Sequence, residues 1–194
     1  MIIMKDESTE NIILTKAIGL FAAKGYEAIG VQEICDVSEI TKPTLYYYFG
    51  SKSGLFSKIA ETKGRELTDL IRNALEYKHD FIFSATKVLK DEIDFALKNK
   101  DFFRIHANLS NSPEGSEAKI IYKEVLGKIS KLFEDFFTLS ANEFGNMRGK
   151  EKLYSILFHG NILSVISNVL NNSINVTDET IYQIIHRFVY GVAS

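Results

Sequence analysis

One stretch of the sequence, residues 41–52, gathers the side chains that best suit contact with nucleic acid. Short polar and basic groups that reach base edges are supplied by Thr41, Lys42 and Thr44. Groups that suit phosphate contacts are supplied by Tyr46, Tyr47 and Lys52. Residues 40–60 contain three lysines and no acid, whereas residues 1–39 contain three lysines and seven acids. The sequence therefore predicts a local DNA-contacting surface, although the whole chain has a net charge of −2.

Patterns of residues typical of catalysis or metal binding do not occur in the sequence. The four histidines, at positions 79, 106, 159 and 186, have no metal-ligand spacing, and no glycine-rich phosphate loop follows a strand pattern. The single cysteine, Cys35, excludes a disulfide framework and multi-cysteine zinc sites, and we expect it to be a small buried hydrophobe. We predict a protein without enzymatic activity, cofactor or metal.

The composition is that of an ordinary globular protein. Of the 194 residues, 45% are apolar and 25% charged, which argues against disorder. The first ten residues turn acidic before any long apolar run, so we expect no signal peptide. No uninterrupted apolar run approaches the ~18 residues of a membrane span. We therefore expect a cytoplasmic protein that does not bind membranes.

Helical periodicity at the N-terminus predicts a helix over 9–24, a short one over 31–37 and a third that begins at Thr41. The Thr41 hydroxyl can cap this third helix, and Pro43 occupies its first turn, where a missing N–H does no harm. We expect Leu45, Tyr48 and Phe49 to face inward and Tyr47 to face solvent. Two short helices three to four residues apart are typical of a helix-turn-helix.

The rest of the chain also has helical periodicity. Helices are predicted over 51–75, 81–98, 101–109, 115–141, 151–170 and 178–192, with a break from Gly145 to Gly149. Lys63 interrupts the apolar stripe of the first of these helices. The predicted fold class is all-α, with a helix-turn-helix domain over 1–52 and a larger helical domain over 53–194.

Residues 25–56 resemble the DNA-binding domain of the TetR family of bacterial transcriptional regulators. The matching residues are Gly25-Tyr26, then Val31, Ile34 and Cys35, then the run Thr41-Lys42-Pro43-Thr44-Leu45-Tyr46, then Tyr48-Phe49, Ser51-Lys52 and Leu55-Phe56. The resemblance implies a homodimer that binds a palindromic operator in double-stranded DNA through the helix at 41–47. It also implies a repressor that a small-molecule effector releases from DNA.

Two residues depart from the family pattern. Glu39 stands where the family usually has glycine in the turn, which would cost about 1 kcal/mol if the backbone there is left-handed. Gly30 stands where a threonine often caps the second helix. Both departures favour an alternative, a helical small-molecule-binding or interaction protein that retains the helix-turn-helix only as a scaffold.

Eight phenylalanines lie between residues 81 and 137, and most of them are needed for the core of a helical bundle. A minority, with polar groups on the same apolar faces, are expected to line a pocket for a small apolar or aromatic effector. The residues we predict to bind it are Phe102, Phe103, His106, Tyr122, Phe133, Phe137 and His159.

The last two helices, 151–170 and 178–192, are predicted to form the homodimer interface. Gly160, Ser164 and Ser167 place small side chains on one face of the first, and the second carries an apolar stripe that includes Ile181 and Ile185. Burial of this stripe within one subunit is the alternative. Dimers of this kind read two half-sites of a palindrome.

Overall fold

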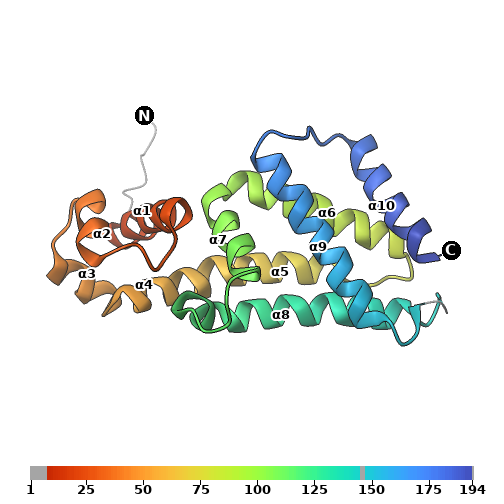
Figure 1. Cartoon of the computed structure of the whole chain (residues 1–194), viewed down its shortest axis with the longest axis horizontal. Helices are drawn as coiled ribbons and strands as arrows, with labels where there is room; N and C mark the ends of the chain where they lie inside the picture. Colours follow the sequence, from red (N-terminus) through yellow and green to blue (C-terminus); the bar gives the residue numbers. More distant parts are fainter. Residues whose placement is uncertain (1–7, 145–146, 194) are drawn as a thin grey trace. The chain divides into compact units, whose positions relative to one another are not determined.

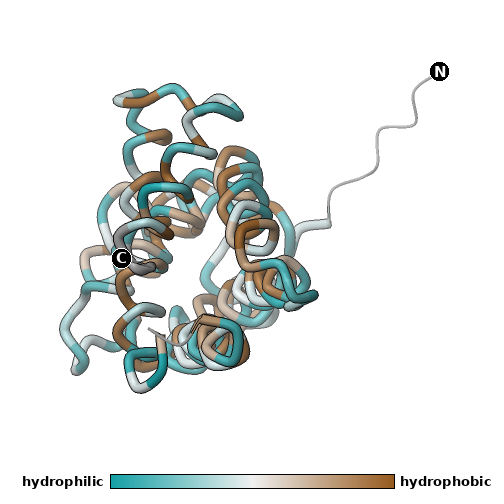
Figure 2. The backbone as a smooth tube through the Cα atoms, turned by 90° about the vertical axis from the view of Figure 1, so that its right-hand side faces the viewer, coloured by the Kyte–Doolittle hydropathy of each residue, from teal (hydrophilic) through white to brown (hydrophobic). Residues whose placement is uncertain are grey.

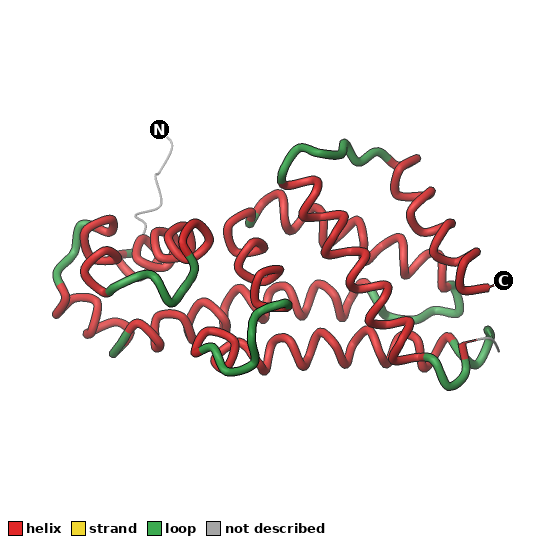
Figure 3. The backbone as a smooth tube through the Cα atoms, viewed as in Figure 1, coloured by secondary structure: helices red, strands yellow, loops and turns green. Residues whose placement is uncertain are grey.

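The computed structural model describes residues 8–144 and 147–193, which form ten α-helices and one π-helical turn, with no strand among them (Figure 3). The predicted all-α class is confirmed. The segment 1–7, where we expected no signal peptide, lies outside the described residues, as does part of the predicted break at 145–149. The chain divides into two compact units, one of Met1–Gly64 and Asp101–Lys123 and the other of Arg65–Lys100 and Glu124–Ser194.

The N-terminal part of the first unit contains α1 (Thr9–Lys24), α2 (Val31–Ser38), α3 (Lys42–Phe49) and α4 (Lys52–Ile59), labelled in Figure 1. These helices bury one apolar face each, because their apolar residues recur with helical spacing. Three aromatic rings, of Phe21, Tyr26 and Phe56, pack together with centroid distances of 4.9–5.4 Å. The other buried side chains include Ile13, Ala17, Ile29, Ile34, Cys35, Leu45 and Leu55.

Side-chain caps fix the start of α3 and of α4. The Thr41 hydroxyl accepts a hydrogen bond from the Thr44 N–H at 3.4 Å, and the Ser51 hydroxyl accepts one from the Gly54 N–H at 2.9 Å. Pro43 lies in the first turn of α3, and Gly50, with φ 73°, ends that helix. The predicted cap at Thr41 is confirmed.

The helix predicted over 51–75 is not a continuous α-helix, which corrects the expectation. A π-helical turn, η1 (Ala60–Gly64), separates α4 from α5 (Arg65–Ala74). The wider turn buries Ala60 and Gly64 and leaves Lys63 half-buried, so the lysine no longer falls on the buried stripe. A π-turn adds a residue to the helical repeat, and periodicity counted at 3.6 residues per turn does not reveal it.

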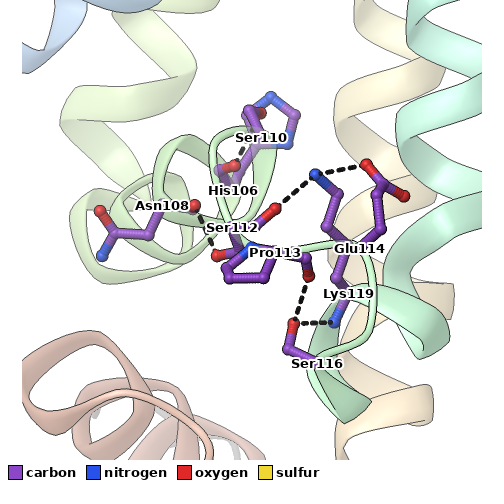
Figure 4. Close-up of polar contacts among 8 residues, drawn as sticks. All are labelled: His106, Asn108, Ser110, Ser112, Pro113, Glu114, Ser116 and Lys119. Atoms are coloured by element: carbon purple, nitrogen blue, oxygen red, sulfur yellow. Dashed lines mark hydrogen bonds and ion pairs between the residues drawn. The ribbon is translucent and has the colours of Figure 1, made fainter.

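The rest of the first unit is α7 (Lys100–Ser110) and the beginning of α8 (Glu117–Ser140), joined by a loop with its own polar network (Figure 4). Lys119 Nζ donates to the Ser112 carbonyl at 2.8 Å and pairs with Glu114 at 3.0 Å. The Ser116 hydroxyl donates to the Pro113 carbonyl at 3.1 Å (Figure 4). The buried ammonium of Lys119 therefore holds the loop against the first turn of α8.

The second unit consists of α5, α6 (Phe81–Lys98), α8 from Glu124 onward, α9 (Glu151–Leu170) and α10 (Asp178–Ala193). Within it, α6 packs against α5, α9 and α10. Hydrophobic and hydrophilic segments alternate along the helices, as expected for amphipathic bundle helices (Figure 2). The predicted boundary between 1–52 and 53–194 as functional domains stays a prediction.

Helix α9 has an unusual composition for a bundle helix. Among the described residues it is the one helix long and apolar enough to cross a membrane by length and composition. It contains no long uninterrupted apolar run, because polar residues such as His159 and Asn161 interrupt the sequence without lowering its average hydropathy far. Only 22% of the most apolar 18-residue segment of α9 is buried, so the helix exposes an apolar face.

Candidate functional site

Helix α3 presents most of its surface to solvent. Leu45 alone is fully buried and anchors the helix, while Thr41, Lys42 and Pro43 at its start are exposed. Tyr47 is 83% exposed and Tyr46 is exposed as well. The predicted exposure of the start of this helix and of Tyr47 is confirmed.

The hydroxyls of Thr41 and Thr44 are hydrogen-bonded to each other at 2.9 Å. Since the Thr41 hydroxyl also caps α3, its position is fixed by the helix itself. Thr44 is half-buried, and its hydroxyl is held beside the cap. The pair therefore forms a rigid polar surface next to the exposed Lys42, a geometry that suits hydrogen bonds to base edges or phosphates.

Tyr48 is 40% exposed, contrary to the expectation that it is buried. Its ring packs edge-on against Tyr47 at 5.2 Å, while Phe49 is half-buried. A helix of eight residues packs along a single row through Leu45 and Phe49, so the position three residues after Leu45 falls at its edge. The tyrosines thus form an exposed aromatic surface along α3.

Lys52 lies at the first position of α4, and its ammonium contacts the loop between α1 and α2. Lys52 Nζ donates to the carbonyl oxygens of Tyr26 and Ile29, each at 3.1 Å, and lies 4.0 Å from the centroid of the Tyr26 ring. No pattern of residue types indicates this role, because the partners are backbone atoms 23 and 26 residues away. The phosphate contact predicted for Lys52 stays a prediction, and it would use the donor that these two bonds leave.

The turn between α2 and α3 has the left-handed backbone that glycine favours. Glu39 has φ 54° and ψ 40°, and the Ile40 N–H donates to the Cys35 carbonyl at 3.0 Å, which is the pattern of a Schellman motif. At the other end of α2, Gly30 precedes the helix without a side-chain cap. Both departures from the family pattern therefore have a local structural cost, but the two helices still form.

An exposed, acid-free helix that follows a second helix after a short turn defines a helix-turn-helix DNA-binding domain. Residues 13–59 match the family described as bacterial regulatory proteins, tetR family. The HTH-type transcriptional repressor BdcR of Escherichia coli (strain K12) is 41% identical over 58 residues, which cover 28% of this chain and 29% of the repressor. Residues 13–59 are therefore similar to the DNA-binding domain of that family, and the matched segment spans less than a third of the repressor's length.

Solved structures extend the likeness in fold to nearly the whole chain. A TetR-like transcriptional regulator from Rhodococcus sp. RHA1 has a TM-score of 0.77 at 18% identity, covering 98% of this chain and 99% of that one. The regulator FadR from Bacillus subtilis, in complex with stearoyl-CoA, has a TM-score of 0.70 at 15% identity, covering 94% and 97%. The fold is therefore TetR-like beyond the segment matched by sequence.

Four of the residues predicted to bind an effector form one buried cluster in the first unit. His106 Nδ1 lies 3.2 Å from the Tyr122 hydroxyl, and the His106 ring packs against Phe103 at 5.6 Å. The Phe102 ring lies 6.3 Å from that of Tyr122. Burial raises the pKa of Tyr122, so its hydroxyl stays protonated and can donate or accept a hydrogen bond.

The remaining three predicted residues lie in the second unit. The His159 ring stacks on Phe133 with a centroid distance of 4.5 Å, and Phe137 packs edge-on against Phe158 at 5.9 Å. Burial lowers the pKa of His159 to about 4, so the imidazole is neutral at physiological pH. Contact of any of the seven residues with an effector stays a prediction.

The first unit also contains a cleft that the sequence did not indicate. It has a volume of about 420 Å³ and is lined by residues of the α1–α2 loop, α4, α7 and the α7–α8 loop, among them Phe21, Tyr26 and Leu109. Beside it, the Glu27 carboxylate accepts a hydrogen bond from the Glu117 N–H at 3.1 Å, at the start of α8. An acid at a helix N-terminus is favourable, so Glu27 links the α1–α2 loop to α8.

Proposed function

We propose that the protein is a transcriptional repressor that binds a palindromic operator as a homodimer. The observation that carries this proposal is the exposed, acid-free surface of α3, with Lys42, Thr44 and Tyr47 at its centre. Its N-terminal residues would contact bases in the major groove, and the tyrosines and Lys52 would contact phosphates. Such a protein acts in the cytoplasm, where the operator is.

Substitutions on α3 test the DNA-binding role. We expect Lys42→Ala to weaken binding to the operator and to reduce the salt dependence of that binding, because a lysine in the major groove contacts base edges and also releases counterions from DNA. We expect Thr44→Ala to change the base preference at one position of the half-site by about 1–3 kcal/mol. Lys16→Ala, which removes an exposed lysine of α1, is the matched control for loss of charge. Equal losses for Lys42→Ala and Lys16→Ala would contradict the proposal.

For the homodimer, we propose an interface formed by α9 and the exposed side of α10, which carries Tyr182 and Tyr190. The α10 stripe residues Ile181 and Ile185, which we expected at the interface, are buried within the subunit because they pack in its own core.

Leu153, Ile156 and Leu157 of α9 are exposed, and the exposed Gly160 and Ser164 would let a second helix approach closely. A contiguous apolar face of this kind favours a second copy of the chain as its partner. The same face accounts for the membrane-like composition of α9.

Light scattering coupled to size-exclusion chromatography tests the interface. We expect Ile156→Glu to convert the dimer to a monomer, because the charge would be buried against the partner's apolar face. Ile120→Glu, at an equally exposed isoleucine of α8, is the matched control and should leave the dimer intact. A dimer that survives Ile156→Glu, or a wild-type monomer, would refute this interface.

We further propose that a small molecule with an apolar or aromatic part releases the repressor from DNA. The buried aromatic residues with embedded polar groups support this, since such linings are typical of small-molecule sites. The fold neighbour FadR from Bacillus subtilis was solved with stearoyl-CoA, which shows that a related fold accommodates a ligand with a long apolar chain. Binding must favour a separation of the two α3 helices that no longer fits successive major grooves, about 34–36 Å apart.

The second candidate is a helical small-molecule-binding or interaction protein that retains the helix-turn-helix as a scaffold. The left-handed Glu39 and the uncapped start of α2 at Gly30 favour it. A scaffold of this kind would bind specific and scrambled duplexes equally weakly in an electrophoretic shift. A repressor would discriminate between them.

A further inference from the structure

Glu92 is a carboxyl group in the interior of the second unit. It lies on α6, is 0% exposed, and neither carboxylate oxygen has a hydrogen-bond partner among the described residues. Val88 and Leu89, one turn before it, and Phe95 and Ala96, one turn after it, are also buried. The face of α6 that carries the carboxyl is therefore otherwise apolar.

No cation of the second unit is placed to neutralise this carboxyl within the described residues. On α6 itself, Lys87 pairs with Asp91, Lys90 pairs with Asp178 at 2.6 Å, and Lys98 in the last turn is exposed. On the helices packed against α6, the cations are Arg65 and Arg72 of α5, Lys152 of α9 and Arg187 of α10, and all four are exposed.

The histidines and acids of these helices do not neutralise Glu92 either. His159 of α9 is neutral at physiological pH because burial lowers its pKa to about 4, and His186 of α10 is half-buried beside Tyr182 and Tyr190. No acid of α5, α9 or α10 is buried. Burial therefore raises the pKa of Glu92 to about 8, and its carboxyl is largely protonated at neutral pH.

An unsatisfied buried carboxyl contributes nothing to packing that an apolar side chain would not provide at lower cost. Nearly all buried polar groups in folded proteins have a partner, so an exception calls for a group that is supplied from outside the chain. The supplied group must donate hydrogen bonds and tolerate an apolar surrounding.

We infer that Glu92 recognises a cationic nitrogen on the effector, so that the effector is a hydrophobic amine or amidine. A positive N–H donor displaces the Glu92 proton to solvent and satisfies the resulting carboxylate both by hydrogen bonds and by charge. An anionic ligand could accept only one hydrogen bond from the protonated carboxyl, and its own charge would stay uncompensated in an apolar surrounding. Binding of an amine at Glu92 does not depend on the proposed function. Only the role of this ligand as the effector of a repressor rests on it. Recognition of a cation also separates this chain from a regulator that binds an anionic acyl-CoA.

Calorimetric titration of the full-length protein tests the inference with three probes of the same chain length, decylamine, decanol and decanoate, each below its micellar concentration. We expect the wild type to bind the amine at least about tenfold more tightly than the alcohol, and to bind decanoate most weakly. In Glu92→Gln the preference for the amine should fall to about twofold or less, with the affinity for decanol unchanged.

Proton release gives a second readout, which a merely structural role would not change. At pH 7, binding of the amine should displace about one proton from the wild type, measured in two buffers of different ionisation enthalpy, and none from Glu92→Gln. If Glu92→Gln does not fold, Glu92→Met takes its place. This variant should likewise lose the preference for the amine and the release of a proton on amine binding. An unchanged amine preference in either folded variant, or equal binding of amine and alcohol by the wild type, would overturn the inference.

DNA binding without any probe is measured on the same proteins. Selective DNA binding together with no amine preference would reject the charge-recognition role of Glu92 alone. Amine selectivity that depends on Glu92, in a protein that does not discriminate between duplexes, would support the site and reject the repressor.

Discussion

Replacement of Glu39 by glycine should stabilise the protein. The residue has φ 54° and ψ 40°, and the hydrogen bond from the Ile40 N–H to the Cys35 carbonyl requires this left-handed backbone. An L-residue in this conformation costs about 1–2 kcal/mol, while the greater freedom of glycine in the unfolded chain offsets roughly 0.4–1 kcal/mol. The net gain in the free energy of unfolding should be about 0.5–1 kcal/mol, or roughly 1–4 °C in the melting temperature for a chain of this size.

Urea unfolding followed by circular dichroism measures this gain, and two controls separate its causes. Glu39→Ala removes the carboxylate but keeps the Cβ, so it should change stability by less than about 0.3 kcal/mol. Gly50→Ala, at φ 73° and ψ −39°, should cost at least about 1 kcal/mol, because this backbone lies outside the left-handed helical region of Glu39 and strains an L-residue more. If Glu39→Ala stabilised the protein as much as Glu39→Gly, charge and not backbone strain would be the cause. The reasoning would then be refuted.

Three further substitutions test other contacts. The pKa of Glu92 is about 8 in the folded protein, above its value in the unfolded chain, so between pH 5 and 8 the folded state holds a proton that the unfolded state releases. The free energy of unfolding of the wild type should therefore fall with rising pH, relative to that of Glu92→Gln, by at most about 1.4 kcal/mol per pH unit in this range. Parallel pH profiles of the two proteins would contradict this. Lys52→Met keeps the apolar stem but loses both bonds to the Tyr26 and Ile29 carbonyls, and it should cost about 1–2 kcal/mol in urea unfolding. Glu27→Gln should cost about 0.5 kcal/mol, because the charge at the start of α8 is lost, and this effect should diminish in 1 M salt.

Most of the fold could be predicted because its signals are local. Helical periodicity placed each helix, and the hydroxyl of Thr41 with Pro43 two residues later correctly indicated where α3 begins. The left-handed turn at Glu39 could be anticipated through the resemblance to the TetR family, which usually has glycine at that place. The π-turn at Ala60–Gly64 could not be predicted, since periodicity counted at 3.6 residues per turn does not reveal one inserted residue.

The candidate site was predictable only where exposure follows from position on a helix. Tyr47 faces solvent as expected, but Tyr48 does too, because a short helix has little surface with which to bury two rings. The contacts of Lys52 are with backbone atoms distant in sequence, which leave no pattern in the residue types. Glu92 reads as an ordinary charged position between Asp91 and Ile93, and only the packing of α6 reveals that it is buried.

Selection of bound duplexes from a random pool tests most directly whether α3 reads DNA. The wild-type protein should enrich an inverted repeat whose half-sites are centred about 34–36 Å apart or a multiple of that distance. The double variant Lys42→Ala, Thr44→Ala should enrich nothing, while retaining the helical content and oligomeric state of the wild type. A wild-type protein that enriches no sequence, or a double variant that enriches the same repeat, would contradict the assignment of α3 as the DNA-reading helix.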